Sequence, residues 1–326
     1  MTTNPIEHRI TSQVESYISF KQGMGFQLLV EAAELRRLAA FACLLKHDGS
    51  LTVELALNWV TDKPGRSRWY QARRLETVHR FAQYVRLLDN ETQIPRPGIF
   101  GHCHGRTVPY IFTVDEVVLL MESASKLYSP DGLRAHSVRI AIGLLWATGL
   151  RVGELCQLDR DDVELGSGEI HVRQTKFNKE RKIPIHATVV EQLRAYALNR
   201  DAVCTNTKAS HFFLWTNGEP LTVRKLDYSF TVIRDHLLPP GQQIWQRRPP
   251  RLYDVRHSFA CATIRRWYDE GIDVNHHLLL LSTYLGHVKP SDTYWYLTGI
   301  PELLALTTDR FQHWAMHSAL KEAPHE

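Results

Sequence analysis

Twelve residues near the end of the chain decide how the rest of it is interpreted: Leu285-Gly286-His287-Val288-Lys289-Pro290-Ser291-Asp292-Thr293-Tyr294-Trp295-Tyr296. A Gly-His pair ends an apolar run, a Pro-Ser-Asp turn follows, and a tyrosine lies nine residues after the histidine. The pattern is weak on its own, because tyrosines and turn-flanking histidines are common in protein cores. It becomes informative together with basic residues that lie far upstream.

The first upstream segment is Thr148-Gly149-Leu150-Arg151, which opens a predicted helix carrying Glu154. A glycine here lets the backbone turn sharply and directs the first helical turn at an anion. The planar guanidinium of Arg151 can bind two phosphate oxygens at once. Glu154 lies one turn on, where a buried ion pair with Arg151 would orient it. The structural alternative is an ordinary ion pair at the start of a helix.

The second upstream segment centres on Arg256, in a predicted helix that spans about residues 251–267. Tyr253 and Arg256 stand three residues apart on one face, so both can meet the same ligand. Arg247 and Arg248 add positive charge at a Pro-rich turn just before it. Arg151 and Arg256 directed at one phosphate explain both segments. A surface helix that starts with several arginines is the alternative.

A basic hairpin is the third upstream feature. Residues 169–174 alternate apolar and polar side chains, residues 182–185 return after a polar turn, and this pattern is typical of two paired strands. The tip of such a hairpin can enter a DNA groove and place an ammonium group beside a leaving oxygen. Lys176 is the candidate, with Lys179, Arg181 and Lys182 as its basic neighbours, and their spacing does not choose among them.

Tyr296 is the candidate nucleophile. A phenol has an ordinary pKa of about 10, so neighbouring cations must favour the phenolate. Tyr294 lies two residues earlier and competes on chemistry alone. Two arginines, a lysine, a histidine and a tyrosine are the groups needed to attack a DNA phosphate without a metal. The residues therefore predict a DNA strand-exchange enzyme that needs no cofactor and no metal.

Composition agrees with an ordinary globular protein of two domains. The chain has 326 residues, of which 44% are hydrophobic and 23% charged. Its net charge of +4 permits a polyanionic partner without requiring one. No apolar run is long enough to cross a bilayer, and the N-terminus lacks a signal pattern. The five cysteines are scattered, which predicts a reduced, cytoplasmic protein with no membrane partner.

The first predicted domain, residues 1–90, consists of four helices at about 10–20, 28–45, 53–60 and 67–88. The last helix opens on basic residues interleaved with Trp69 and Tyr70, the pattern expected where a helix lies on a phosphate backbone. The predicted DNA contacts are Arg66, Arg68, Arg73 and Arg74, together with Lys179, Arg181, Arg247 and Arg248 from the second domain. A solvated helix face is the alternative.

Residues 91–112 are rich in Pro and Gly and predict a linker. Its His102-Cys103-His104 run has no second pair at zinc-ligand spacing, so no metal site is predicted. The second domain, residues 113–326, begins with a capping-box pattern at Thr113 and Glu116. Its predicted helices lie at about 113–125, 133–146, 189–197, 222–236, 251–267, 275–285 and 302–316. The last has a large apolar face for a terminal element.

These motifs together resemble the tyrosine recombinase (phage integrase) family. The family's Thr-Gly-Leu-Arg-x-x-Glu-Leu box is similar to residues 148–155, and its Lys-Gly-Asn-Lys-Glu-Arg hairpin resembles residues 176–181, with Phe177 in place of the glycine. Its His-x-Leu-Arg-His box aligns with residues 253–257, where Tyr253 occupies the usual histidine position. Its Leu-Gly-His box matches residues 285–287, and the nucleophile nine residues on falls on Tyr296 rather than Tyr294.

The resemblance implies a mainly α fold with a small β-sheet: a SAM-like helical core-binding domain followed by an α+β catalytic domain of the DNA breaking-rejoining type. It implies that Tyr296 attacks the scissile phosphate to form a 3′-phosphotyrosyl link and that Lys176 protonates the leaving 5′-oxygen. The side chains implied to hold the phosphate oxygens are Arg151, Tyr253, Arg256 and His287. Tyr253 is a poorer proton shuttle than histidine, and His287 is a further proton-shuttle candidate.

The resemblance also implies a biological setting. We expect a site-specific recombinase or integrase of a bacterial mobile element, associated with the nucleoid through double-stranded DNA. Its active assembly would be a homo-tetramer in which the C-terminal helix links the subunits. Whether partner recombinases are also required stays open. A type IB topoisomerase and a catalytically inactive DNA-binding protein on the same fold are the alternatives, the second favoured only by Tyr253.

Overall fold

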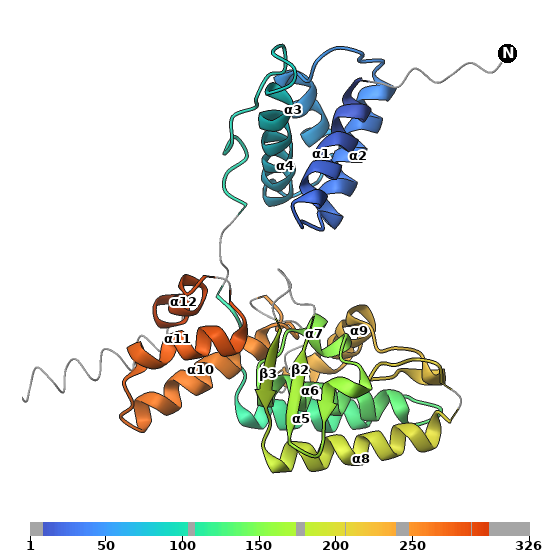
Figure 1. The fold of residues 1–326 in the computed structure, drawn as a ribbon, viewed down its shortest axis with the longest axis vertical. Coiled ribbons are helices and arrows are strands. Elements are labelled where there is room, and N and C mark those ends of the chain that lie inside the picture. Colours follow the sequence, from blue (N-terminus) through green and yellow to red (C-terminus); the bar gives the residue numbers. More distant parts are fainter. Residues whose placement is uncertain are drawn as a thin grey trace, which may run out of the picture. The chain divides into compact units, whose positions relative to one another are not determined.

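The computed structural model describes residues 9–103, 108–173, 180–205, 207–238, 248–287 and 289–299. The chain forms two compact units, Met1–Thr107 and Val108–Glu326 (Figure 1). The division falls inside the predicted linker. Residues before it belong to the first unit, where Gln93 N donates to Leu51 O over 2.8 Å and Trp69 Nε1 donates to Cys103 O over 2.9 Å. Residues after it belong to the second unit, where Phe112 N donates to the Ser258 hydroxyl.

Four helices make up the described part of the first unit: α1 (Arg9–Gly23), α2 (Leu29–Leu44), α3 (Val53–Thr61) and α4 (Arg68–Arg86). All four agree with the predicted ranges to within a few residues. The side chains of Thr52 and Ser67 cap α3 and α4 by accepting hydrogen bonds from backbone amides in the first turn. The apolar faces close around Leu35, Trp59 and Phe81, all fully buried.

Arg74 lies inside this helical core rather than on its surface. Only 4% of Arg74 is exposed, and its guanidinium lies 3.6 Å from the centre of the Trp59 ring. Its Nη1 pairs with the Asp62 carboxylate over 2.7 Å, and its Nε lies 3.4 Å from Glu34. The predicted DNA contact of Arg74 is therefore wrong, because the cation is already occupied by two carboxylates and an aromatic face. The neighbouring Arg73 is exposed.

The second unit is mainly helical. Its described helices are α5 (Val114–Ser125), α6 (Leu133–Thr148), α7 (Val152–Cys156), α8 (Ala187–Val203), α9 (Val223–Arg234), α10 (Asp254–Asp269), α11 (Val274–Leu285) and α12 (Ser291–Gly299), with short 3-10 helices at Arg160–Asp162, Thr216–Gly218 and Asp235–Leu237. The predicted capping box is present, since Thr113 and Glu116 each bond the other's backbone amide. No helix in the described part of the chain is long and apolar enough to span a membrane.

A small antiparallel sheet lies against these helices (Figure 1). Its strand order is β1 (Val163–Glu164), β2 (Glu169–Val172), β3 (Arg181–Pro184), and β2 and β3 are the two strands of the predicted hairpin. Ile170 pairs with Ile183, and both are fully buried in the larger core of the unit. The two-residue strand β1 was not predicted. The mainly α fold with a small sheet is confirmed.

The end of the described chain folds into a smaller core. Ala260 and Ile264 of α10, Leu278 and Leu281 of α11, and Tyr296 of α12 are buried together. The sequence indicated only a turn after Gly286, whereas the structure shows that Ser291 starts a further helix, α12, which carries Tyr296. Helix α10 starts at Asp254, three residues later than predicted. The predicted helix at 302–316 lies outside the described residues.

We expect Arg74→Met to lower the free energy of unfolding of the first unit by about 3 kcal/mol, because it removes a cation from beside the buried Glu34 and breaks the ion pair with Asp62. The exposed control Arg73→Met should change it by no more than about 0.5 kcal/mol. Urea unfolding followed by circular dichroism measures both. A weaker salt dependence of DNA binding in Arg74→Met, with unchanged stability, would instead restore Arg74 to the DNA surface.

Candidate active site

Two glycine turns form the framework of the site. Gly149 ends α6 with φ +62°, and Gly286 ends α11 with φ +67°, a left-handed conformation that glycine adopts without strain. Gly149 also packs closely, because a Cβ placed on it would lie 2.4 Å from Cδ1 of Phe259. The predicted sharp turn before Arg151 is therefore present. Close approach between α6 and α10 is a second reason for its glycine.

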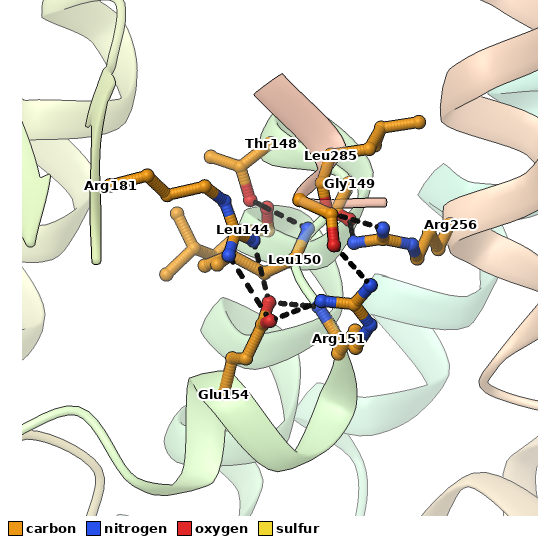
Figure 2. Close-up of polar contacts among 10 residues, drawn as sticks. Leu144, Thr148, Gly149, Leu150, Arg151, Glu154, Arg181, Arg256 and Leu285 are labelled. Atoms are coloured by element: carbon orange, nitrogen blue, oxygen red, sulfur yellow. Dashed lines mark hydrogen bonds and ion pairs between the residues drawn. The ribbon is translucent and has the colours of Figure 1, made fainter. Parts of the chain in front are cut away.

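Arg256 joins both turns. Its guanidinium is 2% exposed, donating from Nη1 to Gly149 O over 2.7 Å and from Nη2 to Leu285 O over 2.6 Å (Figure 2). Burial and the nearby charge of Arg151 lower the pKa of Arg256 to about 10. The side chain therefore remains a cation at neutral pH, and its buried Nε has no hydrogen-bond acceptor among the described residues.

Arg151 comes to the same place from the start of α7. It donates from Nη2 to Gly286 O over 2.9 Å and from Nη1 to Glu154 over 2.6 Å. About a third of its side chain is exposed, so part of this cation faces solvent. Two arginines more than a hundred residues apart in the chain are thus held on neighbouring carbonyl groups, Leu285 O and Gly286 O.

Glu154 holds a second arginine as well as Arg151. Arg181 of β3 donates from Nη2 to Oε2 over 2.7 Å and from Nη1 to Oε1 over 3.2 Å (Figure 2). Burial raises the pKa of the Glu154 carboxyl, but hydrogen bonds and charges from Arg181 and Arg151 outweigh it and lower the pKa to about 2. Arg181 was predicted to contact DNA. Its side chain is 13% exposed and committed to Glu154, so we correct its role to positioning.

Tyr296 lies beside two imidazoles. His257 Nδ1 lies 3.0 Å from the Tyr296 hydroxyl, and the ring of His287 stacks near the Tyr296 ring with centroids 6.5 Å apart. Nδ1 of His287 lies 2.7 Å from the Thr293 hydroxyl. Burial, and then the charges of Arg256 and Arg151, lower the pKa of His287 to about 4. His287 is therefore neutral at neutral pH.

The two tyrosines that competed as nucleophile differ in position. Tyr296 is 2% exposed and lies at the cationic site, whereas Tyr294 is 45% exposed. Both Tyr253 and Tyr296 raise the pKa of Arg256, so both lie near its guanidinium. Tyr253, at the start of α10, is 42% exposed, and its ring is 5.1 Å from that of His257.

Other predicted site residues lie elsewhere or are not described. Four of the predicted DNA contacts are exposed: Arg66, Arg68, Arg73 and Arg248. Lys176, Lys179 and Arg247 lie outside the described residues. Sequence reasoning did not assign a role to His257, although it directly follows Arg256 and lies one helical turn after Tyr253. That spacing was the signal available for finding it.

One group with metal-ligand geometry occurs among the described residues: Glu164, Glu169 and His171 on β1 and β2. Both of its carboxylates already have hydrogen-bond partners, since Ser167 donates to Glu164 and Lys182 donates to Glu169. None of these three residues belongs to the cluster formed by Arg151, Arg256 and Tyr296.

We expect Gly149→Ala to lower the free energy of unfolding of the second unit by at least about 2 kcal/mol. The alanine would have to adopt a left-handed backbone conformation, and its Cβ would collide with Phe259. Gly153→Ala is the matched control, since no atom lies within 4 Å of its Cβ position in helix α7. It should be neutral or slightly stabilising. Thermal unfolding measures both, and equal effects would contradict this account of Gly149.

The Glu154 ion pairs predict a specific loss of stability in acid. Because folding lowers the pKa of Glu154 from 4.5 to about 2, its stabilisation is fully present above pH 4.5 and is lost as the pH falls towards 2. The contribution is roughly 3 kcal/mol. Urea unfolding between pH 5 and 2.5 should show wild type losing this stability relative to Glu154→Gln. Parallel pH profiles of the two proteins would contradict it.

Comparison with known proteins identifies the family of the chain. Residues 111–299, more than half of the chain, match the phage integrase family. Two putative integrase/recombinases of Sinorhizobium fredii are 33% and 36% identical to the chain, covering 91% and 89% of it and 94% and 93% of the relatives. The tyrosine recombinase XerD of Staphylococcus haemolyticus is 30% identical over 75% of this chain and 76% of its own.

The fold has solved counterparts too. The integrase of transposon Tn1549, solved in complex with transposon right end DNA, gives a TM-score of 0.64 at 16% identity, covering 93% of this chain and 99% of that one. This likeness concerns the fold. From the family match and the full-length relatives, the chain belongs to the phage integrase family, the tyrosine recombinases.

Proposed function

We propose that the protein is a site-specific recombinase that cuts and rejoins DNA through a 3′-phosphotyrosyl intermediate. The observation that carries the proposal is the convergence of Arg151 and Arg256 on the carbonyls of one turn, Leu285 O and Gly286 O, close to Tyr296. Two fixed guanidinium groups beside a phenol form a site for a phosphodiester. The relatives named as integrases and tyrosine recombinases support the same activity.

The proposed reaction is a transesterification that conserves the number of phosphoester bonds. The Tyr296 oxygen attacks phosphorus, a bond to the 3′-side phosphate forms, and the bond to the 5′-oxygen breaks. Arg151 and Arg256 stabilise the charge that develops on the non-bridging oxygens. Lys176, which lies outside the described residues, is the proposed acid for the leaving oxygen. A 5′-hydroxyl from a partner duplex then reverses the step.

His287 and Tyr253 are proposed to bind phosphate oxygens by hydrogen bonds. His287 is neutral at neutral pH, and when its Nδ1 accepts from Thr293 its Nε2 carries a proton that can be donated. Tyr253 places a partly exposed phenol near Arg256, where the family has a histidine. A phenol donates a hydrogen bond well and gives up its proton poorly near pH 7.

The first unit offers a surface for the DNA backbone. Arg66 lies 4.9 Å from the Tyr70 ring centre, and Arg73 lies 5.8 Å from the exposed Trp69 ring. With Arg68, these cations form an exposed basic surface at the start of α4 after Arg74 is removed from the set. Such a surface would hold phosphates without selecting a base sequence.

Assembly belongs to the proposal as well. Among similar folds are a lambda integrase tetramer bound to a Holliday junction and a XerH recombinase bound to its palindromic substrate. We propose a corresponding homo-tetramer of this chain on two duplexes, in a bacterial cell and in the service of a mobile element. Its predicted linking segment, residues 302–316, lies outside the described residues.

Covalent trapping tests the proposed chemistry. A duplex selected from a random pool for tight binding, nicked near the cut so that the short leaving strand diffuses away, should capture the wild-type protein. We expect Tyr296→Phe to abolish the adduct and Tyr294→Phe to retain it, because Tyr294 lies half-exposed and Tyr296 lies at the arginine cluster. Denaturing gels with labelled DNA measure the adduct.

Other outcomes would correct the proposal. Loss of the adduct only in Tyr294→Phe would keep the reaction and move the nucleophile. No adduct from wild type on DNA that it binds tightly would favour a DNA-binding protein without activity. Relaxation of supercoiled plasmid by dilute protein, with no exchange between duplexes, would favour a topoisomerase.

A further inference from the structure

His257 lies against the reacting atom of the proposed mechanism. Its Nδ1 is 3.0 Å from the Tyr296 hydroxyl, a distance that permits direct proton transfer. The contact links α10 to α12 across 39 residues. The His257 ring is also enclosed by aromatic neighbours, with centroids 5.1 Å from Tyr253 and 5.9 Å from Trp295.

A phenol that attacks phosphorus must lose its proton. Its ordinary pKa is about 10, so at neutral pH the phenolate is rare without an acceptor at hydrogen-bond distance. An imidazole with an ordinary pKa of about 6.5 is neutral for much of the time at pH 7 and can take that proton. When Nε2 of His257 carries the ring hydrogen, Nδ1 accepts the hydrogen bond from Tyr296.

The other polar groups of the site suit this task less well. Arg151 and Arg256 are cations already bonded to carbonyl groups, and they donate hydrogen bonds only. His287 is a weak base, because burial and the two arginines lower its pKa to about 4. Tyr253 carries a phenol of its own, which is no better a base than the group it would deprotonate.

The geometry points to His257 as the proton acceptor for Tyr296, an inference that rests on the proposed recombinase function. As the Tyr296 O–H bond breaks, the proton passes to His257 Nδ1, the oxygen–phosphorus bond forms, and the bond to the 5′-oxygen breaks. The leaving oxygen takes its proton from a separate acid, proposed above as Lys176. On rejoining, His257 returns the proton to the tyrosine oxygen as it leaves phosphorus.

This role also accounts for the unusual Tyr253. The family box has a histidine at both ends, and this chain keeps only the second, His257, whose imidazole contacts the Tyr296 hydroxyl, while the first position carries the phenol of Tyr253. The ring contact between residues 253 and 257 shows that the two positions border one site. Proton acceptance by His257 is thereby separated from the hydrogen bond to phosphate that is proposed for Tyr253.

Single-turnover cleavage of the nicked duplex at saturating protein tests the inference. We expect His257→Asn to slow adduct formation by at least about 100-fold, because the amide oxygen preserves an acceptor near Nδ1 but takes no proton. The control His276→Asn, exposed on α11, should cleave as wild type does. DNA affinity and thermal unfolding of each variant establish that binding and folding are intact.

The pH dependence separates a base from a residue that only holds the tyrosine in place. As the pH falls through about 7 to 5, protonation of His257 should slow wild-type cleavage. Among the groups around it, Arg256 remains charged over this range, and His287 becomes charged only near pH 4. His257→Asn should be slow and nearly independent of pH. A rate and pH profile equal to wild type would overturn the inference.

A modified leaving group tests which side of the phosphate His257 serves. With a sulfur replacing the bridging 5′-oxygen, the leaving thiolate needs no proton. This substrate should restore cleavage by Lys176→Ala and leave His257→Asn slow, because deprotonation of Tyr296 is still required. Restoration of His257→Asn would assign His257 to the leaving group and overturn the inference. Absence of any wild-type adduct would instead refute the recombinase function itself.

Discussion

The buried guanidinium of Arg256 is the contact on which the catalytic unit depends. The helix that carries it belongs to two cores, since Val255 packs in the larger one and Ala260 and Ile264 in the smaller one. From this helix the side chain reaches carbonyls 107 and 29 residues away, at Gly149 and Leu285. A charge with so little exposure is stable only with such hydrogen bonds. The two turns must therefore place the carbonyls of Gly149 and Leu285 within reach of the Arg256 guanidinium.

Glu154 gives this arrangement its electrostatic balance. The guanidinium groups of Arg151, Arg181 and Arg256 would repel one another. The Glu154 carboxylate, which lies between Arg151 and Arg181, offsets part of that repulsion. Because Arg181 belongs to β3, the same carboxylate ties the hairpin to the start of α7. Strand β3 is therefore fixed in position relative to Arg151, the arginine proposed to bind phosphate.

Local patterns account for the parts of the structure that the sequence predicted. The Thr113 capping box and the glycine turns depend on residues a few positions apart, so their spacing is visible in the chain. Arg74 and Arg181 look like other basic residues by spacing, yet their carboxylate partners lie 12 and 27 residues away. The contact between α10 and α12 depends likewise on how the smaller core folds, which no short window of sequence records.

The burial of Tyr296 has a consequence for the proposed reaction. With 2% of the residue exposed, its oxygen is shielded from solvent and from passing nucleic acid. In the proposed reaction a phosphorus atom must reach this oxygen, so Tyr296 must first become exposed, and DNA contacts would supply the free energy for that change. A poorly fitting duplex supplies little of it. For an enzyme of this family, selection among DNA sites then begins with the uncovering of the oxygen, ahead of bond breaking.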